Sequence, residues 1–198
     1  MLETKRKAPS WADPACVGSG RLTARSPLVP FADPDSAYGR DREASPYWMS
    51  LDGKWRFHLS ERPEATPDGY QQTDFDDTSW DEVAVPGNWT CQGYDRPHYT
   101  NVQMPFPGDP PEVPEENPTG LYRRKFRIPK AWRDRRVVVH FGGAESVLYV
   151  WLNGVALGFS KDSRLPAEFD LTPHLKRGEN TLVAAVVRWS DATYLEDQ

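Results

Sequence analysis

The sequence is poor in cysteine and contains no long apolar run. Only two cysteines, Cys16 and Cys91, occur in 198 residues, which is too few for a disulfide framework, and their spacing fits no metal-binding motif. We therefore expect both thiols to be reduced in a cytoplasmic protein. No stretch of about 18 apolar residues is present that could cross a bilayer. The basic N-terminus is not followed by the apolar stretch of a secretion signal.

The sequence also has no excess of positive charge, since 24 Lys and Arg stand against 29 Asp and Glu. The formal net charge is −5, which argues against nucleic-acid binding, because that function needs a basic surface. The densest basic group, Arg123-Arg124-Lys125, lies within a predicted strand. We expect it to form a solvated strand face.

Recognisable catalytic motifs are missing as well. The sequence has no Gly-x-Ser-x-Gly turn and no glycine-rich phosphate loop. A retaining glycosidase needs two carboxyl groups about 5 Å apart, but the acids here, such as those at 74–81, lie mainly in predicted solvated loops. Among the four histidines, only His98 lies in a proline-rich loop, where we expect a structural hydrogen bond. We predict no catalytic residue in this chain.

Proline and aromatic residues are plentiful. Prolines interrupt residues 1–40, which predicts an extended, Pro/Gly-rich arm ahead of a domain at 41–198. A second proline-rich stretch, 86–120, has almost no periodicity, and long loops of this kind are often functional. The eight Trp, eight Tyr and eight Phe are suited either to stacking on sugar rings or to filling a core. We expect most of them to fill the core.

From residue 53 onward the pattern favours strands. Residues 53–59 alternate apolar with polar side chains, which places Trp55, Phe57 and Leu59 on one side. Asn153-Gly154 predicts a type I′ hairpin turn. The succession of strands without a long helix predicts an all-β fold, an antiparallel β-sandwich. The other predicted strands are 83–85, 121–128, 137–141, 146–152, 155–159, 167–171 and 181–189.

Several short segments, taken together in their order along the chain, carry a resemblance. They are LDGKWRF at 51–57, VPGNW at 85–89, YTNV at 99–102, ENPTG at 116–120, DSRLPAEFD at 162–170, RWSD at 188–191 and YLEDQ at 194–198. In this order and spacing they resemble the N-terminal sugar-binding domain of the large β-galactosidases of glycoside hydrolase family 2. The segments at 99–102 and 162–170 favour the galactosidase branch over the family's glucuronidases and mannosidases.

The resemblance implies a jelly-roll sandwich, similar to galactose-binding domains, whose long loop reaches an active site built mainly by a later barrel. It makes Asn101 a ligand of the galactosyl hydroxyls, with Val102 beside it. A carboxamide is suited to this role because it both donates and accepts hydrogen bonds, as a hydroxyl does. The alternative for Asn101 is a turn residue that caps its own loop.

The resemblance further implies a retaining hydrolase of terminal non-reducing β-D-galactosides such as lactose, with two catalytic glutamates. The resemblance places those glutamates in the later barrel, so we expect this chain alone to be inactive. It also places a substrate- and sodium-binding acid directly after YLEDQ, so we expect the domain to be truncated at its C-terminal end. The full-length enzyme would use Mg²⁺ and Na⁺, whereas we expect no ion to bind this chain tightly. Its partners would be the galactoside, the catalytic barrel and, through the arm, other subunits of a homo-oligomer.

In some family members a peripheral magnesium ion links the arm to the sandwich. Matching by position places Asp13 and Asp191 at that site. Two departures stand beside them, because Ser10 replaces an acid and Lys161 replaces a glutamine. A protonated lysine offers no lone pair and repels a cation.

Two alternatives to an enzyme fragment follow from the fold alone. The chain could be a self-standing carbohydrate-binding module, or an assembly domain that binds no sugar. The chain ends within the YLEDQ segment rather than after a closing strand, which favours the fragment.

Overall fold

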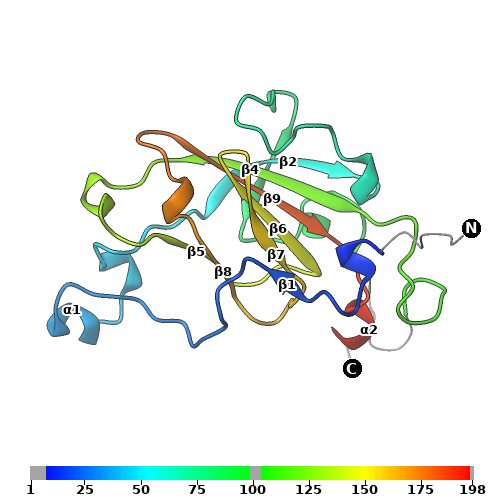
Figure 1. Ribbon diagram of the computed structural model, residues 1–198, viewed down its shortest axis with the longest axis horizontal. Coiled ribbons are helices and arrows are strands. Elements are labelled where there is room, and N and C mark those ends of the chain that lie inside the picture. The colour runs from blue at the N-terminus through cyan, green and yellow to red at the C-terminus, as the bar shows by residue number, and fades with distance from the viewer. Residues whose placement is uncertain (1–7, 99–103, 197–198) are drawn as a thin grey trace, which may run out of the picture.

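Seven antiparallel strands form one sheet, and a two-stranded sheet faces it. The structure, a computed structural model shown in Figure 1, describes residues 8–98 and 104–196. In spatial order the large sheet contains β1 (Gly18–Ser19), β7 (Val155–Ser160), β6 (Val147–Leu152), β9 (Asn180–Val187), β4 (Thr119–Phe126), β2 (Gly53–Ser60) and β3 (Asp81–Val85). The small sheet pairs β5 (Val138–Phe141) with β8 (Ala167–Asp170).

Helices are few and short. The α-helices are α1 (Pro34–Tyr38) and α2 (Thr193–Glu196), and the 3₁₀ turns are η1 (Ser10–Ala12), η2 (Arg42–Ala44), η3 (Pro63–Ala65), η4 (Trp89–Cys91), η5 (Lys130–Trp132) and η6 (Thr172–His174). Over residues 8–98 and 104–196, no helix has the length and apolar character to cross a membrane. The predicted all-β antiparallel sandwich is confirmed.

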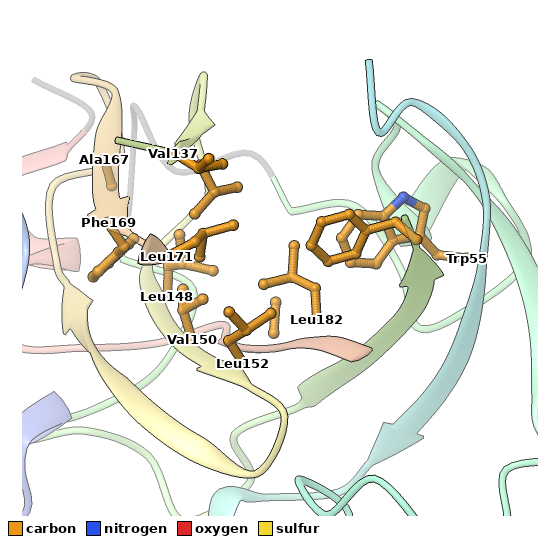
Figure 2. Packing of buried hydrophobic residues seen from close by; sticks show 12 residues of the cluster. Trp55, Val137, Leu148, Val150, Leu152, Ala167, Phe169, Leu171 and Leu182 are labelled. Atoms are coloured by element: carbon orange, nitrogen blue, oxygen red, sulfur yellow. The ribbon is translucent and has the colours of Figure 1, made fainter. Parts of the chain in front are cut away.

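The main core lies between the two sheets. It draws side chains from β2, β4, β6 and β9 of the large sheet and from β5 and β8 of the small one. Figure 2 shows Leu148 and Val150 gathered with Phe169 and Leu171, and Trp55 at one end of the cluster. Complete burial of each such side chain contributes about 1.5–3 kcal/mol, so this layer provides a large part of the folding free energy.

The sequence placed the strands well because their signals are local. Each predicted strand is present, with ends shifted by three residues or fewer. The hairpin at Asn153 and Gly154 is also confirmed, since both residues have the positive φ, 53° and 86°, that a type I′ turn requires.

One strand, β1, was not predicted, because its two residues lie in the proline-rich arm. It pairs with β7, placing Gly18 opposite Ser160. The approach is so close that a Cβ at Gly158 would lie 1.9 Å from the carbonyl oxygen of Ser19. A glycine on the edge strand thus allows the arm to extend the sheet.

The outer face of the large sheet is not solvated at β4. Residues of the 61–80 loop cover it, and Trp80 packs against Leu121 and Ala185. Arg123 lies on the same face as Leu121 and is only 2% exposed. The prediction of a solvated Arg123-Arg124-Lys125 face is therefore wrong for Arg123, because a loop distant in sequence folds over it.

Gly120 on β4 is predicted to tolerate no side chain. A Cβ there would lie 2.5 Å from the Trp89 ring and 2.9 Å from Phe57. We expect Gly120→Ala to lower the free energy of unfolding by about 1–3 kcal/mol through overpacking, as measured by urea denaturation. Gly142→Ala is the matched control, because its added Cβ meets no atom within 4 Å. Equal urea midpoints for the two variants would contradict this packing.

Candidate functional site

The two ends of the 95–112 loop are held on one platform. This platform consists of Arg188 and Trp189, directly after β9, and Tyr194 in α2. The predicted sugar ligands Asn101 and Val102 belong to this loop but lie outside the described residues, so their roles stay predictions. The structure does describe the residues on either side of them.

Arg188 holds the first end of the loop. Its Nη1 pairs with the carboxylate of Asp95, and its Nη2 donates to Nδ1 of His98 at 2.7 Å. The guanidinium also lies over the Trp189 ring, 4.7 Å from its centroid. Both partners of the ion pair are largely buried, with side chains 12% and 16% exposed. Burial lowers the pKa of Arg188 from its ordinary value, but an arginine stays charged at neutral pH.

This arrangement also defines the role of His98. Because the guanidinium can only donate, Nδ1 of His98 must be the acceptor, which leaves its proton on Nε2. The ring also packs edge-on against Trp189, with centroids 5.5 Å apart. The structural hydrogen bond predicted for His98 is thereby confirmed.

The second end of the loop is held by aromatic packing. Phe106 meets Trp189 and Tyr194 edge to face, at centroid distances of 5.3 and 5.7 Å. The Tyr194 hydroxyl donates to the carbonyl oxygen of Glu112 at 2.8 Å. The chain on both sides of residues 99–103 is thus attached to the same short segment, 188–194.

Asn117 fixes the platform to the sheet. Its Nδ2 donates to the carbonyl oxygen of Trp189 at 2.9 Å, and its Oδ1 accepts from the Trp189 backbone N–H at 2.8 Å. The side chain therefore replaces a strand partner where the β4–β9 pairing ends. Sequence reasoning gave Asn117 no role. Its position between Pro114 and Pro118, in a proline-rich stretch, was the available signal for a fixed loop.

The acids predicted for a peripheral cation do come together, but around a lysine. Lys161 Nζ donates to the backbone oxygen of Asp13 at 2.8 Å and to Oδ1 of Asp191 at 2.6 Å. The Asp13 carboxylate instead accepts from the backbone N–H of Ala15 at 3.1 Å. Among the described residues no group of three or more His, Cys, Asp or Glu side chains is placed to hold a metal ion. As they stand, these residues do not fit a divalent cation.

Comparison with known proteins identifies the family. The model for glycosyl hydrolases family 2, sugar binding domain, matches residues 48–198. The chain belongs to this family. Two solved structures share the fold. A Bifidobacterium dentium β-glucuronidase is 27% identical, with a TM-score of 0.53 and coverage of 69% of this chain and 19% of that one. A Faecalibacterium prausnitzii β-glucuronidase is 26% identical, with a TM-score of 0.52 and coverage of 70% of this chain and 20% of that one.

Sequence relatives of this family 2 domain are named β-galactosidases. A protein of Psychromonas ingrahamii is 47% identical over 192 residues, which cover 97% of this chain and 18% of that protein. A Vibrio cholerae protein is 46% identical over 192 residues, covering 95% and 18%. The chain therefore spans about a fifth of the length of the curated relatives that it matches, and the predicted family 2 sugar-binding domain is confirmed.

Proposed function

We propose that the chain is the sugar-binding domain of a β-galactosidase and that its 95–112 loop forms one wall of the active site. The observation that carries the proposal is the match of nearly the whole chain to proteins named β-galactosidase, at 47% and 46% identity. The similarity to the β-glucuronidase structures is weaker, at 27% and 26%. This difference supports a galactoside rather than a glucuronide as the substrate.

In this proposal the chain binds and orients the sugar, while the rest of the enzyme cleaves it. Asn101 directs its carboxamide to galactosyl hydroxyls, and the platform at 188–194 fixes the loop that carries it. The general acid of a retaining glycosidase needs a raised carboxyl pKa. By contrast, hydrogen bonds lower the pKa values of Asp33, Asp76 and Asp170. Asp95 is engaged by Arg188, so it is not available as a free acid.

The proposal extends to the partners of the domain. The catalytic barrel, with the enzyme's Mg²⁺ and Na⁺ sites, completes the pocket, and the arm contacts other subunits. Two large apolar side chains of the arm are available to such a contact, because Leu28 is 74% exposed and Tyr38 is 83% exposed.

A chimera tests the function. We expect the isolated chain to hydrolyse no nitrophenyl β-galactoside, and expect activity when it replaces the matching segment of the Psychromonas ingrahamii protein. Within that chimera, Asn101→Ala should lower kcat/KM for the galactoside roughly tenfold, because loss of one sugar hydrogen bond costs about 1–1.5 kcal/mol. Steady-state kinetics with the nitrophenyl galactoside provides the measurement.

Asn88→Ala is the matched control, since Asn88 is exposed and its side chain does not cap η4. It should leave kcat/KM unchanged. A chimera that prefers a nitrophenyl glucuronide would contradict the galactoside assignment. Tight lactose binding by the isolated chain, measured by calorimetry, would favour a self-standing carbohydrate-binding module.

A further inference from the structure

A buried lysine lies between the arm and the sandwich. Lys161 comes directly after β7 and is 4% exposed. Its ammonium donates to Asp13 O at 2.8 Å and to Asp191 Oδ1 at 2.6 Å, and the Asp191 side chain is only 8% exposed. Lysine is almost never fully buried unless it is paired. This ammonium is therefore a fixed internal cation with a carboxylate counter-ion.

The two oxygens come from segments that are far apart in the sequence. Asp13 follows η1 in the arm, and Asp191 lies between β9 and α2. Figure 1 shows η1, in dark blue, beside α2, in red. Backbone hydrogen bonds accompany the ammonium: Asp191 N donates to Trp11 O at 3.1 Å, and Lys161 N donates to Val17 O at 3.2 Å. The arm is thus attached on both sides of Asp13 by the two residues that form the ion pair.

A carboxylate oxygen and a carbonyl oxygen around one point are also the ligands of a divalent cation. Magnesium and calcium bind such oxygens at about 2.0–2.6 Å and need six or more of them. Here that point is filled by Nζ, whose charge would repel a second cation. The Asp13 carboxylate does not join these two oxygens, because it accepts from the backbone N–H of Ala15.

We propose that the Lys161 ammonium takes the place of a divalent cation and fastens the arm to the sandwich without metal. The lysine supplies positive charge at the junction of Asp13 O and Asp191 Oδ1, and a chelator cannot remove it. Replacing it with glutamine supplies an oxygen and removes the charge. The variant Lys161→Gln should therefore attach its arm only when a divalent cation is present.

Trypsin cleavage in the arm provides the measurement. Arg21 and Arg25 follow β1, and both side chains contact the sandwich, at Ser160 and Glu168. Arg21 and Leu22 are half-buried, and the backbone N–H of Leu22 donates to the carbonyl oxygen of Glu168 at 2.8 Å. Cleavage between these two residues therefore requires the arm to open, so its rate reports the open population. For the unmodified chain we expect the same rate of loss of residues 1–21, followed by mass spectrometry, in EDTA and in millimolar MgCl₂. This measurement needs no variant.

Two variants complete the test. In EDTA, Lys161→Gln and Lys161→Met should both be cleaved at least about tenfold faster, because Asp191 is left buried without a counter-ion. MgCl₂, but not NaCl of equal ionic strength, should restore protection to Lys161→Gln and not to Lys161→Met, whose side chain offers no oxygen. The control Lys54→Gln removes an exposed surface pair with Glu82 and should be cleaved like the unmodified chain.

Three results would overturn the proposal. The first is cleavage of the unmodified chain that slows with MgCl₂ or accelerates with EDTA. The second is cleavage of the Lys161→Met arm by trypsin at the same rate as cleavage of the Lys54→Gln arm. The third is a Lys161→Gln arm that is cleaved faster than the unmodified arm and is not protected by MgCl₂. Lys161 would then act only as the partner of Asp191 in a buried ion pair. None of these readouts depends on galactosidase activity.

Discussion

Replacing Arg123 with leucine is expected to destabilise the domain by about 3–5 kcal/mol, the usual cost of removing one partner of a buried ion pair. Arg123 Nε donates to Asp77 Oδ2 at 2.7 Å, and its Nη1 donates to the carbonyl oxygens of Tyr70 and Gln72. The arginine side chain is 1% exposed. Without it, the Asp77 carboxylate, which is 20% exposed, and two carbonyl oxygens of the 61–80 loop lose their donor.

Urea denaturation of the isolated chain measures this effect. Lys125→Leu is the matched control on the same strand, because its pair with Glu179 is exposed and such surface pairs contribute at most about 1 kcal/mol. The double variant Arg123→Leu with Asp77→Leu should recover part of the loss, since no unpaired charge then remains. An Arg123→Leu domain within about 1 kcal/mol of the unmodified one would contradict the role of the pair.

Arg188→Met, made in the active chimera, is expected to lower kcat/KM for a galactoside about a hundredfold. The reason is geometric. Arg188 holds Asp95 and His98, and a displacement of about 1 Å in a group that orients substrate is enough for an effect of this size. We expect the arginine to act through the loop, as a positioning residue. Kinetics normalised to the concentration of active sites provides the measurement.

The division between KM and kcat separates this role from a merely structural one. Reduced folding alone would lower the number of active sites and leave KM unchanged, whereas a displaced loop raises KM and lowers kcat together. Arg188→Lys should recover part of the activity, because an ammonium still pairs with Asp95 but does not reproduce the planar fork. Arg127→Met, at an exposed position after β4, is the control. An unchanged KM in Arg188→Met would contradict positioning.

Much of the fold could be predicted because strand and turn signals are local. Alternation over 53–59 fixed the buried face of β2, and Asn153-Gly154 fixed a hairpin, because neighbouring residues alone decide both. The same local view failed for Arg123. Alternation placed it beside Leu121, but only the covering 61–80 loop decides that this face is buried.

In the candidate site, too, the sequence predicted some features and only the fold revealed others. Its loop could be located from its prolines and from the resemblance around 99–102, but the platform that holds it could not. Arg188 and His98 are 90 positions apart, and no local pattern pairs them. The lysine at 161 was visible as a departure from the family, yet its partners Asp13 and Asp191 lie on two other segments, and only the folded chain brings them to one point.

By itself, then, the sequence determined the strands, the hairpin, the long loop and the family, because each depends on residue order or on short-range backbone preference. Tertiary structure alone decided which charges are buried and which oxygen atoms share a cation. Those outcomes depend on contacts between distant segments, which form only when burying apolar surface brings the strands together.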